Sequence, residues 1–281
     1  AAVRGLQERR GLQVDGVVGP ATIGALNAQN TATLEDIIAN MERWRWMPED
    51  MGDLNVFVNI PEFRLYVMRD KQVSFTTRVI VGRAEFQTPI FSDQIEHVVV
   101  NPYWNVPASI ARNEIGPRVY NNPGYLAAND MELLSAAGHA INASAVDWSS
   151  TSINNFRIRQ RPGTGNALGK IKFLFPNQHA VYLHDTPSRS LFNSDYRTFS
   201  HGCVRVQDPM AFAQALLVNE PVLSRAGLEA QFGPRERWNN LENKVPVHLA
   251  YFTVRADDAG NLQSFPDPYG HNERLKQILA N

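Results

Sequence analysis

The chain is poor in cysteine, in net charge and in long apolar runs. It has one cysteine in 281 residues, so no internal disulfide can cross-link the fold. Its 27 basic and 28 acidic residues give a net charge of -1, and without a long basic run we expect no nucleic-acid partner. No apolar segment approaches the roughly 20 residues of a membrane helix, and no signal peptide is visible. With 43% hydrophobic residues, the composition agrees with a soluble enzyme that has a substantial core.

The lone cysteine lies in the string SHGCVR at residues 200–205. A single thiol offers a metal only one soft ligand, so nucleophilic attack is its expected use, and a small buried hydrophobe is the ordinary alternative. In an extended segment His201, Cys203 and Arg205 share one side, where two potential cations favour the reactive thiolate. Gly202 would let a substrate carbonyl approach the backbone, and the amides of Gly202 and Cys203 would then stabilise an oxyanion.

A candidate base lies upstream of this string. Residues 180–186 read as a strand that ends at Pro187, with Tyr182 and His184 on one face. About fifteen residues separate His184 from the cysteine string, enough for a loop that brings the imidazole to face Cys203 across a cleft. The alternative is a histidine satisfied at the end of a strand.

The two segments together resemble the L,D-transpeptidase catalytic domain, the YkuD-like family. Its motif is a histidine followed some fifteen residues later by Ser/Thr-His-Gly-Cys, a hydrophobic residue and Asn or Arg, and residues 184 and 200–205 match it throughout. Residues 182–187 and 166–170 further resemble the large Gram-negative branch. Asp185 departs from the glycine or serine that many members carry after the base. The resemblance implies Cys203 as nucleophile and His184 as general base and acid.

The resemblance also implies the fold class. We expect an α+β chain: a β-rich catalytic domain with an inserted, mostly helical and loop cap, preceded by a small partial helical peptidoglycan-binding module. Residues 2–22 resemble that module, with Val3 and Leu6 on a helix face, a helix starting at Pro20, and Ile23 and Leu26 continuing into a core. Because the family module normally has another helix first, we expect the chain to begin partway through it.

Neighbouring residues receive supporting roles. His201 is expected to shape the site rather than act as base, because adjacent alternating side chains lie side by side. The Asp185 side chain points away from His184 in an extended strand, so a backbone carbonyl is the expected partner of the imidazole. Arg205 is a candidate ligand for a substrate carboxylate, or an arginine paired with a nearby acid. Tyr182 either donates to the oxyanion and lines the acyl site or packs on the sheet.

Patterning divides the chain into residues 1–30 (partial module), 31–50 (connecting helix) and 51–281 (catalytic domain, cap about 106–165). The connecting helix should present one apolar stripe, and two tryptophans should dock it to the next domain: Leu34, Ile37, Ile38, Met41, Trp44 and Trp46. Strands are predicted over 55–60, 64–68, 73–81, 95–100 and 245–254, and helices over 131–137, 208–217 and 273–279. Tyr103 and Trp104, at the cap entrance, either line a substrate groove or pack in a core.

The expected reaction follows the resemblance. Cys203 attacks the meso-diaminopimelate-D-alanine bond of a peptidoglycan tetrapeptide stem, releases D-alanine, and passes the acyl group to a diaminopimelate amine of another stem as a 3→3 cross-link. Carbapenems are expected to acylate the thiol, no cofactor or metal is required, and the substrate places the enzyme in the periplasm. Alternatives are an envelope protein as acceptor, water as acceptor, a non-catalytic wall-binding protein, or zinc held by His184, His201 and Cys203.

Overall fold

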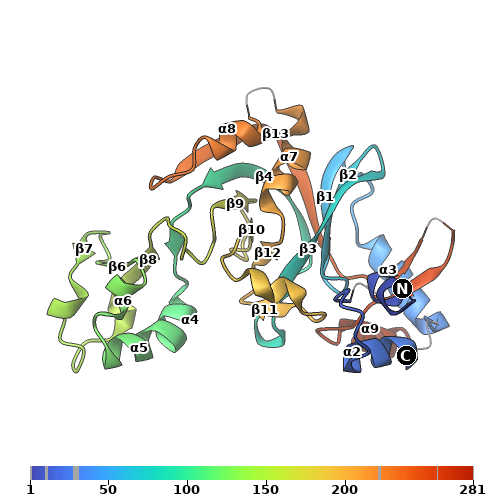
Figure 1. Ribbon diagram of the computed structural model, residues 1–281, viewed down its shortest axis with the longest axis horizontal. Helices are drawn as coiled ribbons and strands as arrows, with labels where there is room; N and C mark the ends of the chain where they lie inside the picture. The colour runs from blue at the N-terminus through green and yellow to red at the C-terminus, as the bar shows by residue number, and fades with distance from the viewer. Residues whose placement is uncertain (1, 10–11, 28–31, 221–222, 258, 281) are drawn as a thin grey trace.

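A closed, barrel-like sheet forms the centre of the protein (Figure 1). The computed structural model describes residues 2–9, 12–27, 32–220, 223–257 and 259–280. Nine strands of this described chain follow the order β11-β3-β12-β10-β9-β4-β13-β1-β2, and β2 also pairs with β3, which closes the ring. The strands are β1 (Leu54–Asn59), β2 (Arg64–Arg69), β3 (Gln72–Gly82), β4 (Phe91–Val100), β9 (Ile171–Leu174), β10 (Leu183–His184), β11 (Thr198–Ser200), β12 (Val204–Val206) and β13 (Arg237–Ala250).

Local sequence explains how this sheet starts and how it is filled. Strands β2 and β3 are joined by Asp70 and Lys71, whose φ angles of 48° and 65° suit a tight hairpin turn. Side chains of valine, isoleucine, leucine and phenylalanine from every side of the ring form one core. The predicted strands over 55–60, 64–68, 73–81 and 95–100 are confirmed.

Helix α7 (Pro209–Leu216) closes the core, where Phe212 meets Phe173 edge to face with ring centroids 4.5 Å apart. The helix predicted over 208–217 is confirmed within one residue at each end; Asp208 precedes it, and the Asp208 carboxylate accepts a hydrogen bond from Thr77 Oγ1 at 3.1 Å and does not cap the helix. Two short helical segments, α8 (Arg225–Glu229) and η6 (Leu217–Asn219), follow α7, and η5 (Arg189–Asn193) precedes β11.

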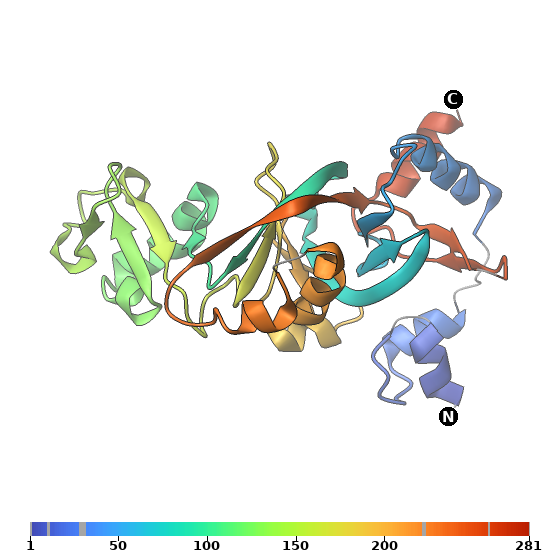
Figure 2. The same ribbon diagram turned by 90° about the horizontal axis from the view of Figure 1, so that it is seen from above.

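The inserted segment forms a lobe at one end of the molecule (Figures 1 and 2). It has its own hydrophobic cluster, separate from the barrel core. Its elements are β5 (Trp104–Asn105), α4 (Ala108–Ile110), the π-helical η2 (Ala111–Ile115), α5 (Gly116–Asn121), α6 (Tyr125–Ala128), β6 (Met131–Leu134), β7 (Ala140–Ile141), η3 (Ala143–Ala145), η4 (Ile153–Asn155) and β8 (Arg157–Gln160). We call residues 106–165 the cap.

The helix predicted over 131–137 is wrong. Residues 131–134 form β6, which pairs with β8 and, through a turn at Gly138 (φ 86°), with β7. Such a short apolar run fits either a helix or a strand, and here the two neighbouring strands decide the outcome.

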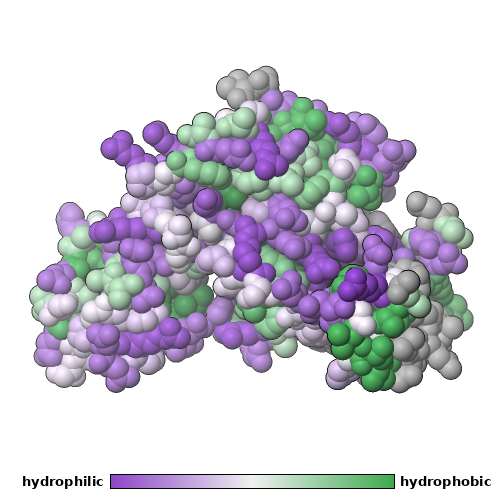
Figure 3. Space-filling view, in the orientation of Figure 1, coloured by the Kyte–Doolittle hydropathy of each residue, from purple (hydrophilic) through white to green (hydrophobic). Residues whose placement is uncertain are grey.

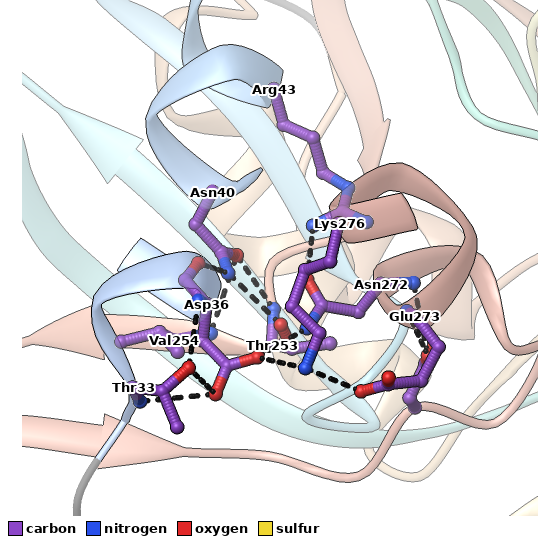
Figure 4. Close-up of polar contacts among 10 residues, drawn as sticks. Thr33, Asp36, Asn40, Arg43, Thr253, Val254, Asn272, Glu273 and Lys276 are labelled. Carbon is purple, nitrogen blue, oxygen red and sulfur yellow. Dashed lines mark hydrogen bonds and ion pairs between the residues drawn. The ribbon is translucent and has the colours of Figure 1, made fainter. Parts of the chain in front are cut away.

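At the opposite end, α3 (Leu34–Arg45) packs against α9 (His271–Leu279) through polar side chains (Figure 4). Asn40 accepts from the backbone N–H groups of Thr253 and Val254 at 2.9 and 3.3 Å, and buried Arg43 donates to Asn272 at 2.8 Å. Thr33 and Asp36 form a capping box at the start of α3. Strands β14 (Val254–Ala256) and β15 (Leu262–Ser264) form a hairpin beside this interface.

The predicted apolar stripe of α3 therefore does not face the core. Leu34, Ile38 and Met41 are 67%, 44% and 63% exposed. Trp44 does contact the next domain, stacking on Phe252 with centroids 4.5 Å apart, whereas the indole N–H of Trp46 donates to Glu42 of α3. The neighbouring segment presents backbone N–H groups that need hydrogen-bond acceptors. The Asn40 face of the helix supplies an acceptor, and the apolar stripe has none.

The N-terminal segment contains α1 (Ala2–Arg9) and α2 (Pro20–Asn27) around a polar centre. Buried Gln7 donates to Asp15, Val17 and Thr22 and accepts from the Gly16 N–H. The expectation that Ile23 continues into a core is wrong, because Ile23 is 46% exposed. An apolar patch lies at the surface in the region of α2 (Figure 3). The side chain of Leu26, like Thr31 in the connecting segment, lies outside the described residues. Within the described chain, no helix is both long and apolar enough to cross a bilayer.

Candidate functional site

The two motif segments lie side by side in the barrel. Strand β10 pairs with β12 in parallel, Leu183 opposite Val204 and His184 opposite Arg205, and with β9 antiparallel, His184 opposite Lys172. Residues paired across strands share a face of the sheet. Leu183 and Val204 are fully buried in the core, so His184, Arg205 and Lys172 lie together on the outer face.

Cys203 precedes β12 and lies beside Tyr182, because the Val204 N–H donates to the Tyr182 carbonyl at 3.1 Å. The cysteine is half-buried, and its Sγ lies 3.8 Å from the carbonyl oxygen of Ala180, a residue held at φ 52°. Burial raises the pKa of the thiol, against the hydrogen bonds from the Tyr182 amide and hydroxyl and the charge of Arg205. The thiol therefore keeps its proton at neutral pH and needs a base.

His184 has the properties of that base. Its Nδ1 lies 2.5 Å from the backbone carbonyl oxygen of Asp185, so Nδ1 carries the proton and the Nε2 lone pair is free. The prediction of a backbone carbonyl as orienting partner is confirmed. Burial, with the charges of Arg205 and Lys172, lowers the pKa of the imidazole to about 3, against the hydrogen bond to Asp185. The ring is thus neutral at physiological pH, and its Nε2 lone pair can accept a proton.

The Asp185 carboxylate points away from the imidazole, as predicted, and fixes the neighbouring loop. It accepts from the backbone N–H groups of Thr186 and Lys170 at 2.7 and 2.8 Å, and it pairs with Arg189 at 2.6 Å. A Cβ at Gly169 (φ 62°) would lie 2.3 Å from this carboxylate, so the loop can only approach so closely with glycine there. These contacts give a structural reason for an aspartate after the base.

The Gly202 amide, for which an oxyanion role was predicted, is engaged in a local hydrogen bond. That N–H donates to Ser200 Oγ at 3.1 Å, and the Ser200 hydroxyl in turn donates to the Cys203 carbonyl at 2.5 Å. The bend at Gly202, with φ 111°, turns its amide into this local network. The Cys203 amide has no acceptor among the described residues and remains available to an oxyanion.

His201 turns toward the cap. Its Nε2 lies 2.6 Å from Glu114 Oε1, and Arg83, which also contacts His201, reaches the same carboxylate at 3.4 Å. Glu114 belongs to the π-helical turn η2, a type of helix distortion that is frequent at functional sites. The histidine next to the nucleophile thus links the cysteine loop to the cap.

Arg205 has no acidic partner among the described residues. It is half-buried, its Nε has no hydrogen-bond partner, and burial lowers the pKa of its guanidinium. Lys172 nearby faces Glu236 at 3.8 Å. Arg205 was expected either to pair with a nearby acid or to bind a substrate carboxylate. The described residues provide no such acid, so the guanidinium keeps donors for a carboxylate.

Tyr103 and Trp104 lie at the base of the cap. Trp104 is in β5 opposite Gln160 and packs on the hydrophobic cluster of the cap. Of the two roles expected for it, the structure shows packing in a core. Tyr103 stacks beneath Arg159 at 4.3 Å, and its N–H donates to Glu236 at 2.9 Å.

Sequence reasoning missed two members of this site. Lys172 is a lone cation in the apolar run of β9, and that isolation was the available signal. Glu114 has no local signal, because its partner is 87 positions away. No cluster of three or more His, Cys, Asp or Glu within the described ranges is arranged to hold a metal.

Comparison with known proteins places this geometry in a family. Residues 54–223 match the L,D-transpeptidase catalytic domain model, YkuD, and residues 1–26 match a model provisionally described as a peptidoglycan binding domain. A Haemophilus influenzae protein, provisionally named L,D-transpeptidase, is 32% identical over 248 residues, which cover 88% of this chain and 50% of that protein. The chain thus spans about half the length of this relative.

Similar solved structures include an L,D-transpeptidase (Yku) from Stackebrandtia nassauensis, at 14% identity and TM-score 0.33, covering 88% of this chain and 75% of that one. L,D-transpeptidase 3 from Mycobacterium tuberculosis, solved with a faropenem-derived adduct, has 11% identity and TM-score 0.33, covering 70% and 60%. With the catalytic-domain model matching more than half of its length, the chain belongs to the YkuD family of L,D-transpeptidase catalytic domains.

Proposed function

We propose that the protein is a peptidoglycan L,D-transpeptidase that uses Cys203 as nucleophile and His184 as general base and acid. The observation that carries the proposal is the neutral imidazole of His184, held by the Asp185 carbonyl on the strand beside the cysteine loop. A half-buried thiol with a raised pKa and a buried imidazole with a lowered one are both neutral, so attack needs proton transfer between them.

The steps balance within this pair. His184 Nε2 takes the thiol proton as Sγ attacks the carbonyl carbon of the third residue of a tetrapeptide stem, meso-diaminopimelate. The Cys203 amide and the Tyr182 hydroxyl are the donors beside the developing oxyanion. When the tetrahedral intermediate collapses, His184 returns the proton to the leaving D-alanine amine. A diaminopimelate side-chain amine then attacks the thioester, gives its proton to His184, and frees the thiol with a 3→3 cross-link.

We assign recognition of the substrate carboxylates to Arg205 and Lys172, the two cations beside His184 on the outer face of the barrel. Stems end in carboxylates, and Arg205 has open donors in a partly buried position, where a charge-assisted hydrogen bond is strong. Lys172 adds positive potential from the neighbouring strand. We assign the second histidine, His201, to positioning of the cysteine loop through Glu114.

The cap is assigned the role of limiting water at the thioester, since its Glu114 touches the cysteine loop. A peptidoglycan substrate places the protein in the cell envelope, in the periplasm of a Gram-negative cell. Carbapenems, which carry an acylating carbonyl and a carboxylate, are expected to acylate Cys203 by the same first step.

Incubation with purified disaccharide-tetrapeptide, followed by mass spectrometry of the products, tests the proposal. A cross-linked dimer and free D-alanine, both absent with Cys203→Ala, support it. A tripeptide monomer alone indicates hydrolysis, and no product indicates a wall-binding protein. If only an added envelope protein becomes coupled to the donor, the acceptor is a protein amine.

A further inference from the structure

A groove lies on the outer face of the barrel, on strands other than those that carry the proposed catalytic residues. It has a volume of about 690 Å³ and runs over β1 and β2. In the closed ring, β9, β4 and β13 separate β1 from β10 in one direction and β3 separates β2 from β12 in the other, so the groove lies on strands that do not carry the motif residues. The catalytic proposal uses none of the residues of this groove.

Alternation along β1 builds the floor of the groove. Asn55, Phe57 and Asn59 share one face, and Met68 and Tyr66 of β2 lie directly opposite Asn55 and Phe57. Most of these side chains are buried, so the floor is fixed by the sheet rather than by mobile loops.

An aromatic platform forms one wall. Trp44, at the end of α3, stacks on Phe252 with ring centroids 4.5 Å apart and interplanar angle 29°, and Phe57 completes the set at 6.0 Å from Phe252. Phe252 is 4% exposed, whereas Trp44 is 54% exposed, so the indole is held in place yet offers a free surface to the groove.

Acceptor groups surround this platform. Glu49, Asp50 and Asp53 line the same groove and are exposed, and the basic residues Lys71 and Arg255 line it as well. Asn55 is 5% exposed, and its Nδ2 donates to the Gly52 carbonyl at 2.8 Å, which fixes the orientation of the amide. Its buried Oδ1 has no hydrogen-bond partner. Such a group costs free energy unless a ligand or water supplies a donor.

From these observations we propose that the groove binds a pyranose sugar of a glycan strand. The apolar face of a sugar ring packs on an aromatic plane, and its hydroxyls donate to carboxylates and amides. An apolar helix would instead take the exposed charges of Glu49, Asp50, Asp53 and Lys71 out of water without supplying polar partners, which is unfavourable. The choice of the peptidoglycan glycan rests on the proposed function, since the stems are attached to that glycan. Binding here would hold the enzyme to the glycan while the stems reach Cys203.

Titration of the protein with the β-1,4-linked tetramer of N-acetylglucosamine, followed by the NMR signals of its indole N–H groups, tests this inference. The chain has five tryptophans, and Trp44→Phe and Trp46→Phe assign the two signals of interest. We expect the Trp44 signal to move and the Trp46 signal to stay. Trp46 is the matched control, because it is 58% exposed two positions along the chain but does not line the groove.

Three variants test the binding residues through the dissociation constant. Trp44→Ala should raise the dissociation constant at least about tenfold, as expected for the loss of a central aromatic anchor, and Trp46→Ala should leave it unchanged. Asn55→Leu should also weaken binding. The titration of the wild-type protein still tests the inference if Trp44→Ala folds poorly.

Three results would overturn the inference: no shift at millimolar sugar, shifts confined to other tryptophans, or an equal Trp44 shift with a sugar-free tetrapeptide. Binding should persist in Cys203→Ala. If the groove does not bind sugar, the catalytic proposal is unaffected. If the protein binds sugar but has no transpeptidase activity, the catalytic proposal fails while the groove inference stands.

Discussion

The neutral state of His184 makes a quantitative prediction about stability. Its pKa is lowered from 6.5 to about 3 in the folded protein. Below pH 6.5 the unfolded chain binds a proton that the native state does not, so stability falls as the pH drops from 6.5 toward 3. One pKa unit corresponds to about 1.36 kcal/mol, so at pH 5 the imidazole costs about 2 kcal/mol relative to neutral pH.

His184→Gln removes this proton from the unfolded state. Urea unfolding at pH 7.5 and pH 5 should therefore show that the variant loses about 2 kcal/mol less stability than the wild type over this interval. His248 and His271 also have lowered pKa values, but they remain in both proteins and cancel in the comparison. His179→Gln is the matched control, because it removes an exposed histidine, and its profile should follow the wild type. Equal losses for wild type and His184→Gln would refute the buried neutral imidazole.

Four further predictions follow from the site. Arg205→Gln should raise the KM for a tetrapeptide donor roughly tenfold or more, since a charge-assisted hydrogen bond is lost, and a donor with an amidated carboxylate should show a smaller difference between the two enzymes. Tyr182→Phe should slow alkylation of the single thiol by iodoacetamide at pH 8 by about fivefold, as expected for one hydrogen bond of about 1 kcal/mol, and intact-mass kinetics measure this. Gly169→Ala should cost about 1–3 kcal/mol in urea unfolding, because a Cβ would meet a carboxylate at φ 62°, whereas Gly163→Ala in the same loop has open space and should cost little. Glu114→Gln weakens the contact of the cap with the cysteine loop, so the ratio of tripeptide monomer to dimer should rise. An unchanged ratio would contradict the proposal that the cap limits access of water to the thioester.

The sequence predicted Cys203 and His184 as the reactive pair from short local patterns, and the structure places their strands side by side. Cys203 is a unique thiol between potential cations, and His184 lies on a predicted strand at the spacing of the motif that resembles the L,D-transpeptidase family. Strand patterning likewise predicted the first strands of the β-rich domain. These features depend on neighbours in the sequence, which patterning can read.

Features that depend on distant partners were not predictable in this way. Periodicity found α3 but chose the wrong face, because only the fold places the backbone of Thr253 against Asn40. The Gly202 amide seemed free until the Ser200 hydroxyl was in place. The short run 131–134 became a strand because β7 and β8 pair with it.

The central claim is an acyl-enzyme on Cys203, and intact-mass spectrometry after rapid mixing with a tetrapeptide donor tests it most directly. The account predicts a mass increase equal to the donor minus alanine, on the peptide that contains Cys203, and none in Cys203→Ala. His184→Gln should form the same adduct about 10²- to 10⁴-fold more slowly, as expected for loss of a general base. Product formation by a wild-type enzyme that never carries the adduct, or an adduct that survives in Cys203→Ala, would contradict the account.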